Sequence, residues 1–145
     1  MTHKKILLIE DNPSDIELAQ RALVKSRVAN ELVVIQDGQE ALDYLLGPPP
    51  GGDKLSELPS VVLLDLKLPR VPGLEILRAI RDNPRTRRMP VVILTSSNEE
   101  HDLAAGYDLG VNSYIQKPVD FHQFAAAIQQ LGLYWLILNE APPVA

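Results

Sequence analysis

Four short runs of consecutive apolar residues constrain the fold of this chain more than any other feature of its sequence. They are Ile6–Ile9, Leu32–Ile35, Val61–Leu64 and Val91–Leu94. A strand that is apolar at every position is buried on both faces, which happens chiefly in parallel sheets covered by helices on both sides. Ser113–Gln116 is a weaker fifth candidate. The sequence therefore predicts an internal parallel sheet.

Two helices are marked by capping residues in the first third of the chain. Asn12 can cap a helix that begins at Pro13. Asp37 and Glu40 form a capping box ahead of a second helix, which Gly47 ends. Each helix follows one of the apolar runs, as expected for alternating strands and helices.

Three more helices are predicted in the rest of the chain. Helical spacing of apolar residues begins after Gly73 and ends before Pro84. A fourth helix is expected from about Asn98 to Leu109, and a capping box of Asp120 and Gln123 opens the last. Strand and helix thus alternate five times, which predicts one doubly wound α/β domain with right-handed crossovers over the whole chain.

Composition excludes several roles for this domain. The 145 residues carry a net charge of −5 and no cysteine. This charge repels phosphate backbones and anionic lipid, so neither nucleic acid nor a membrane is expected as a partner. No apolar run approaches the roughly 20 residues of a membrane helix, and no signal peptide is recognisable. We therefore expect a soluble, cytoplasmic protein.

The polar and flexible segments outside the core are expected at the surface. A proline- and glycine-rich stretch within about 47–59 predicts an exposed insertion loop, and residues 139–145 predict a short tail. A cluster of arginines is interpreted as a solvated face around the third helix and the loop after it: Arg78, Arg81, Arg85, Arg87 and Arg88.

Polar residues stand where the predicted strands end. Glu10 and Asp11 follow the first apolar run, and Asp65 follows the third. The carboxyl ends of parallel strands share one edge of the sheet, where ligands bind at the point at which strand order reverses. In a sheet ordered 2-1-3-4-5, the first and third strands are neighbours and the three carboxylates lie close together. Their repulsion favours protonation or a bound cation, and Mg²⁺ is the economical choice for oxygen ligands.

Two further residues at this edge suit a phosphoryl group beside the metal. Lys117, after the fifth strand, can neutralise one phosphoryl oxygen, and the Thr95 hydroxyl, after the fourth run, can hydrogen-bond another. Asp65 can be the acceptor, because a carboxylate is an established nucleophile in aspartyl-phosphate chemistry. The five strand-end residues together indicate phosphoryl transfer.

In this order the five residues resemble the receiver domain of two-component response regulators, over about residues 4–138. The resemblance implies a flavodoxin-like fold, (βα)5, with a five-stranded parallel sheet ordered 2-1-3-4-5. It implies that a sensor histidine kinase or a phosphotransfer protein supplies the phosphoryl group from a phosphohistidine, and that Asp65 accepts it. Mg²⁺ would be held by Glu10, Asp11 and Asp65, and by the backbone carbonyl of Lys67.

The resemblance also assigns roles to residues around the acceptor. Lys117 contacts the phosphoryl group, Thr95 moves toward it, and Tyr114 occupies the aromatic switch position. Lys67 and Ser97 stand beside the path of the attacking water and would tune the rate of hydrolysis. The face built from the fourth helix, the fifth strand and the last helix would then change its partner binding or dimerisation.

No output domain is recognised, so a stand-alone regulator is expected. The insertion loop and the ending of the last helix resemble small regulators that serve bacterial phytochrome-type histidine kinases. That ending is apolar nearly all round, which predicts a homodimer contact, with burial against the insertion loop as the alternative. The side chains of this face are Leu131, Tyr134, Trp135 and Leu138.

Two other functions stay open. A magnesium-dependent phosphohydrolase would also use Asp65 as nucleophile, although Lys67 stands where enzymes of the haloacid-dehalogenase type carry an acid. A pseudo-receiver would bind partners without being phosphorylated, although the intact acid set argues against it.

Overall fold

The computed structural model describes residues 4–26, 30–47, 58–95, 108–110 and 113–116, together with His122 and Ala126. Within these residues five strands form one parallel sheet in the order β2-β1-β3-β4-β5. The predicted strand order is confirmed, and each predicted strand is present. The strands are β1 (Lys4–Ile9), β2 (Asn30–Ile35), β3 (Val61–Asp65), β4 (Val91–Thr95) and β5 (Ser113–Gln116).

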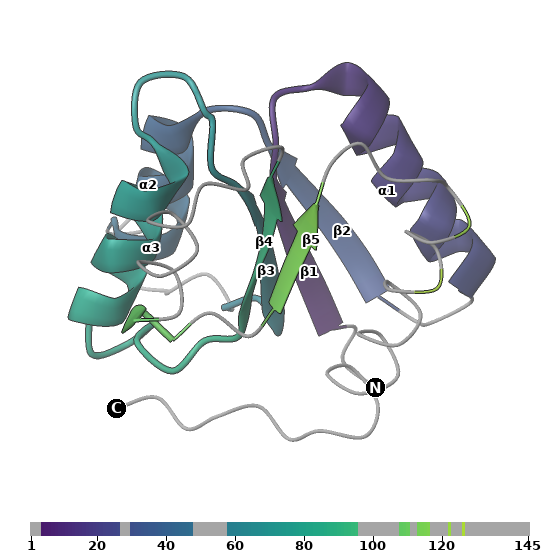
Figure 1. Ribbon diagram of the computed structural model, residues 1–145. Coiled ribbons are helices and arrows are strands. Elements are labelled where there is room, and N and C mark those ends of the chain that lie inside the picture. The colour runs from purple at the N-terminus through teal and green to yellow at the C-terminus, as the bar shows by residue number, and fades with distance from the viewer. Residues whose placement is uncertain are drawn as a thin grey trace.

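Helices cover both faces of this sheet, which confirms the doubly wound, flavodoxin-like class (Figure 1). Helix α1 (Pro13–Ser26) lies on one face, and α2 (Gly38–Leu46) and α3 (Gly73–Asp82) lie side by side on the other. None of the helices in the described part of the chain is long and apolar enough to cross a bilayer. Most of the predicted fourth and last helices, residues 48–57 of the insertion loop, and the tail lie outside the described residues.

The predicted caps set where the helices begin. The Asn12 Oδ1 atom accepts hydrogen bonds from the backbone N–H groups of Ser14 (2.9 Å) and Asp15 (3.2 Å), at the start of α1. Asp37 caps α2 by accepting from the N–H of Glu40 at 3.0 Å. Gly47 ends α2, but with a φ of −75° rather than in a left-handed conformation.

Each apolar run fills two cores, because successive side chains of a strand point to opposite faces. Leu7 and Ile9 pack in the core under α2 and α3, whereas Ile6 and Leu8 pack in the core under α1. Strand β2 is the exception: Leu32, Val33 and Val34 are only half-buried. The expectation of burial on both faces was wrong for β2 because this strand lies at the edge of the sheet, beside β1 alone.

Removing one methylene group from the core under α3 should lower stability measurably. Ile76 is fully buried there, so Ile76→Val should cost about 0.5–1.5 kcal/mol of unfolding free energy. Val24 is 80% exposed on α1, and Val24→Ala should change stability by less than about 0.5 kcal/mol. Urea denaturation of the two variants measures both values, and an equal loss from both would contradict this packing.

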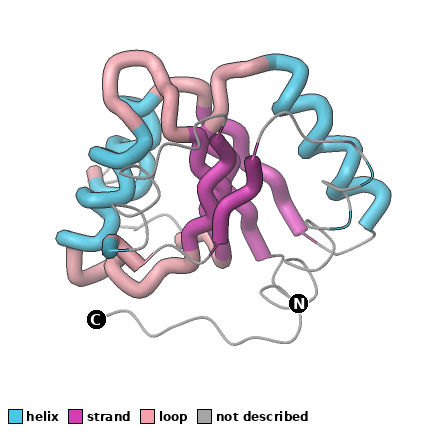
Figure 2. Tube along the Cα trace, in the orientation of Figure 1, coloured by secondary structure: helices cyan, strands magenta, loops and turns pink. Residues whose placement is uncertain are grey.

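The connections between strands and helices lie at the two opposite edges of the sheet where the strands begin and end. The β1–α1 and β3–α3 connections share one edge, and the α3–β4 connection lies at the other (Figure 2). The carboxyl ends of β1 and β3 therefore meet at the first edge, where the sequence places its acidic residues.

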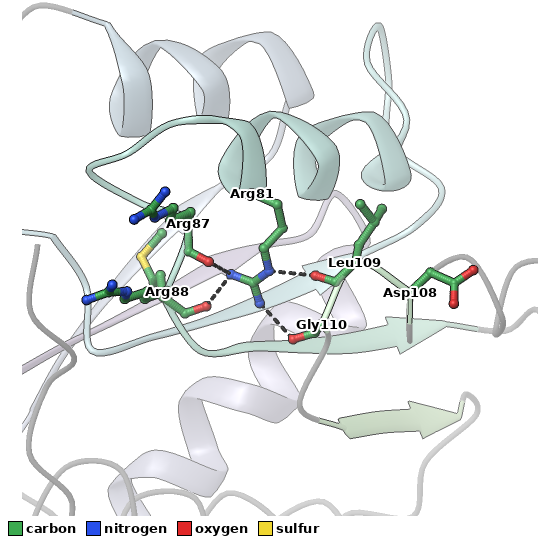
Figure 3. Close-up of a pocket in the computed structure, with 7 residues that line it drawn as sticks. Arg81, Arg87, Arg88, Asp108, Leu109 and Gly110 are labelled. Carbon is green, nitrogen blue, oxygen red and sulfur yellow. Dashed lines mark hydrogen bonds between the residues drawn. The ribbon is translucent and has the colours of Figure 1, made fainter. Parts of the chain in front are cut away.

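Arg81 does not belong to the solvated arginine face that the sequence predicts. At the opposite edge its guanidinium points between the α3–β4 loop and the turn at 108–110 (Figure 3). Its Nε donates to the carbonyl of Leu109 at 2.6 Å, and its Nη2 donates to that of Gly110 at 2.9 Å. Its Nη1 donates to the carbonyls of Arg87 (3.0 Å) and Met89 (2.7 Å). Arg81 is thus a structural residue joining three segments, and its burial lowers the pKa of its guanidinium.

Candidate metal and phosphoacceptor site

The three predicted acids meet at the carboxyl end of the sheet. Asp65 is the last residue of β3, and the β1–β3 register pairs Ile9 with Leu64, so Glu10 follows directly beside Asp65. One carboxylate oxygen from each of Glu10, Asp11 and Asp65 lies within 4.8 Å of the others. We call these three residues the acid cluster.

Two members of the acid cluster are buried and one faces solvent. Glu10 has no exposed surface and Asp65 is 6% exposed, whereas Asp11 is exposed. Like charges this close disfavour one another in a poorly solvated site. A cation approaching from the Asp11 side would relieve that repulsion.

Backbone groups hold the two buried carboxylates in place. The Oε2 atom of Glu10 accepts from the N–H of Asn12 at 3.2 Å. The Oδ1 atom of Asp65 accepts from the N–H of Lys67 at 3.2 Å. The carboxylates are therefore oriented by the connections that follow their own strands.

The donor set of the cluster fits Mg²⁺. Mg²⁺ prefers oxygen ligands, is usually bound through one or two carboxylates, and keeps several waters. The buried carboxylates supply fixed oxygens, and the exposed position of Asp11 leaves room for water.

The β3–α3 loop (residues 66–72) is closed tightly behind Asp65. The N–H of Gly73 donates to the carbonyl of Leu66 at 2.9 Å. A Cβ atom on Gly73 would overlap the backbone carbonyl of Asp65, so only glycine fits where α3 begins. The backbone of Asp65 is thus packed directly against the start of α3.

An ion pair that the sequence does not reveal ties this loop to α2. The Nε of Arg70 donates to Asp37 Oδ1 at 2.8 Å, and its Nη2 donates to Oδ2 of the same carboxylate. Together with the Glu40 N–H, the guanidinium lowers the pKa of Asp37 to about 2. The partners are 33 positions apart, so no local signal predicts their contact.

Other predicted site residues lie outside what the structure describes. Thr95 ends β4 and pairs with Gln116 of β5, which puts its backbone at the same edge of the sheet. The side chains of Thr95 and Tyr114, and all of Lys117 and Ser97, fall outside the described residues. So does the predicted dimer face, formed by Leu131, Tyr134, Trp135 and Leu138.

A sheet of this order with three acids at the reversal of strand order is the arrangement expected of a receiver domain. The chain belongs to the response regulator receiver domain family, whose model matches residues 6–129. The resemblance predicted from the strand-end residues is thereby confirmed.

Within this family the chain is similar to two regulators of comparable length. It is 40% identical over 137 residues to the probable methanogenesis regulatory protein FilR2 of Methanothrix harundinacea, a match that covers 94% of this chain and 86% of FilR2. It is 38% identical over 133 residues to the response regulator Rcp1 of Synechocystis, covering 92% and 89% of the two chains.

Solved structures show the same likeness. The phosphorylated cyanobacterial phytochrome response regulator RcpA matches with a TM-score of 0.83 and 39% identity, over 98% of this chain and all of RcpA. The Mn²⁺-bound form of Rcp1 matches with a TM-score of 0.82 and 35% identity, over 97% and 99% of the chains. The bacteriophytochrome response regulator AtBRR is 52% identical with a TM-score of 0.74, over 97% of this chain and all of AtBRR.

Proposed function

We propose that this receiver domain accepts a phosphoryl group on Asp65 from the phosphohistidine of a sensor kinase or phosphotransfer protein. The observation that carries the proposal is the acid cluster, in which an oxygen of Asp65 lies within 4.8 Å of one oxygen each from Glu10 and Asp11. The similarity to RcpA, whose structure is of a phosphorylated protein, supports the same chemistry.

In the proposed reaction a carboxylate oxygen of Asp65 attacks the phosphorus of the donor. The new bond is Asp65 O–P, the bond that breaks is P–N, and the imidazole nitrogen of the donor keeps the electron pair. The Lys67 N–H orients the Asp65 carboxylate for this attack through its bond to Oδ1. The closed β3–α3 loop keeps the Asp65 backbone from shifting as the new group arrives.

We further propose that Glu10, Asp11 and Asp65, with the backbone carbonyl of Lys67, hold Mg²⁺ in this site. When bound, the ion would neutralise charge on the carboxylates and on the oxygens of the transferring group. The Mn²⁺-bound form of Rcp1 supports a divalent ion in a protein of this kind.

The remaining residues act after the phosphoryl group has transferred. Lys117 contacts the phosphoryl group and Thr95 moves toward it, and Tyr114 repacks in response. Lys67 and Ser97 set how fast water removes the phosphoryl group. The switched surface is the face formed by the fourth helix, β5 and the last helix.

A phytochrome-type histidine kinase is the proposed partner, supported by the similarity to RcpA and AtBRR. The domain would act in the cytoplasm, and it covers 86% and 89% of the lengths of FilR2 and Rcp1. It would dimerise through Leu131, Tyr134, Trp135 and Leu138. Phosphotransfer profiling against a panel of histidine kinases tests the partner, and preferential transfer from kinases of another class would contradict it.

Acetyl phosphate separates this function from its alternatives. With Mg²⁺ and acetyl phosphate, we expect the mass of the protein to rise by one phosphoryl group and no sustained turnover of p-nitrophenyl phosphate. A phosphohydrolase would release product over many turnovers. A pseudo-receiver would neither gain mass nor release product, and either result would contradict the proposal.

A further inference from the structure

The β3–α3 loop has a residue in an unfavourable backbone conformation at its tip. Arg70 has a φ of 67°, and among the described residues it is the only one other than glycine with a positive φ. An L-residue with a side chain pays a conformational penalty in the left-handed region that glycine avoids. A contact that holds the Arg70 side chain can offset this penalty.

The Arg70–Asp37 ion pair is that stabilising contact. The guanidinium presents Nε and Nη2 to the two oxygens of one carboxylate, which is the two-point geometry that gives such pairs their directionality. Asp37 is itself fixed, because its Oδ2 also accepts from the Glu40 N–H at the first turn of α2. Its side chain is 19% exposed, against 62% for Arg70.

A second set of contacts joins the same two segments beside the ion pair. The N–H of Gly38 donates to the carbonyl of Pro69 at 3.3 Å. A Cβ atom on Gly38 would overlap the carbonyl oxygen of Val71, so α2 and the loop touch backbone to backbone. The loop is thus held at its tip by α2, and at its end by the bond from Gly73 to Leu66.

We propose that the Arg70–Asp37 ion pair is a positioning element for the metal site, holding the β3–α3 loop so that the Lys67 backbone faces the acid cluster. The inference rests on the proposed function, because it assumes that a divalent ion binds at Glu10, Asp11 and Asp65. Lys67 lies in the same loop, three residues before Arg70, and its N–H already contacts Asp65 Oδ1. A loop released at its tip would spend less time in this conformation, and apparent metal affinity falls with the fraction of competent molecules.

A positioning role and simple electrostatics predict opposite changes in cation affinity for one of two substitutions. Arg70→Ala removes a positive charge from the loop that follows Asp65, so electrostatics alone predicts tighter cation binding. Asp37→Asn removes a negative charge and predicts weaker binding, while an amide oxygen still caps α2. If the pair positions the loop, both substitutions weaken binding, and the double variant is no weaker than the single ones because they remove one shared contact.

The test is Mn²⁺ binding measured by electron paramagnetic resonance on the whole chain, without phosphodonor. We expect Arg70→Ala and Asp37→Asn each to raise the dissociation constant for Mn²⁺ about three- to tenfold. This change is no larger than the loss of metal affinity that follows removal of a residue hydrogen-bonded directly to a metal ligand. Arg78→Ala, which removes the same charge from the exposed face of α3, is the matched control and should leave the constant unchanged.

Arg70→Gly separates positioning from stability. It removes the ion pair and the backbone penalty together, so it should melt no lower than Arg70→Ala and yet bind Mn²⁺ as weakly or more weakly. Unchanged or tighter binding by Arg70→Ala would overturn the inference while leaving the metal site intact. Absence of Mn²⁺ binding by the unsubstituted protein would instead overturn the proposed function.

Discussion

Asp65→Asn is expected to abolish phosphoryl incorporation from acetyl phosphate. The amide has no anionic oxygen to attack phosphorus, and the other two acids of the cluster follow a different strand, β1. Intact-mass spectrometry in magnesium buffer should show the mass of one added phosphoryl group in the unsubstituted protein and none in the variant. The effect is all or none because the proposed function has a single acceptor, Asp65.

The loss in Asp65→Asn should occur in a folded protein. Asp65 is buried among like charges, so removing its charge relieves repulsion when no metal is bound. The variant should therefore melt at or above the temperature of the unsubstituted protein in EDTA. Asp43→Asn, an exposed change on α2, is the matched control and should label normally. Labelling that persists in Asp65→Asn would place the acceptor elsewhere.

Loss of Asp11 should remove most of the stabilisation that Mg²⁺ gives. A ligand at a hundred times its dissociation constant stabilises the native state by about 2.7 kcal/mol. Asp11→Asn deletes a ligand charge at the solvent-facing side of the cluster, so the Mg²⁺ concentration needed for the same rise in melting temperature should increase at least about tenfold. Thermal melting across a Mg²⁺ titration measures this shift.

The change in stability that Asp11→Asn causes without metal is the control for this second prediction. In EDTA, Asp11→Asn should be at least as stable as the unsubstituted protein, because one of three neighbouring charges is gone. Glu17→Gln removes the same charge from an exposed position on α1 and should keep the full response to Mg²⁺. An Asp11→Asn protein that is unstable in EDTA and still responds normally to Mg²⁺ would contradict the proposed ligand set.

The elements that depend on local sequence are the ones that could be predicted. Buried strands show as unbroken apolar runs, and caps such as Asn12 and Asp37 act within one turn of their own helix. The proximity of Glu10 and Asp65 was also predictable, because strand order alone brings the ends of β1 and β3 together. The position of the acid cluster therefore follows from the order of the strands.

Features that depend on distant segments could not be predicted in the same way. The half-burial of β2 follows from its place at the sheet edge, which its apolar run does not encode. Arg81 looked like one of several surface arginines, yet it binds carbonyls of a turn 28 and 29 positions away. The contact between Arg70 and Asp37 likewise needs the packing of α2 against the β3–α3 loop.

The most direct test of the acceptor is chemical trapping at a single residue. After incubation with acetyl phosphate and Mg²⁺, borohydride reduces an aspartyl phosphate to homoserine, which peptide mass spectrometry can locate in the sequence. We predict homoserine at position 65 and at no other aspartate of the chain. Homoserine at Asp11 or another aspartate, or its absence from a protein that has gained the mass of a phosphoryl group, would contradict Asp65 as the phosphoacceptor.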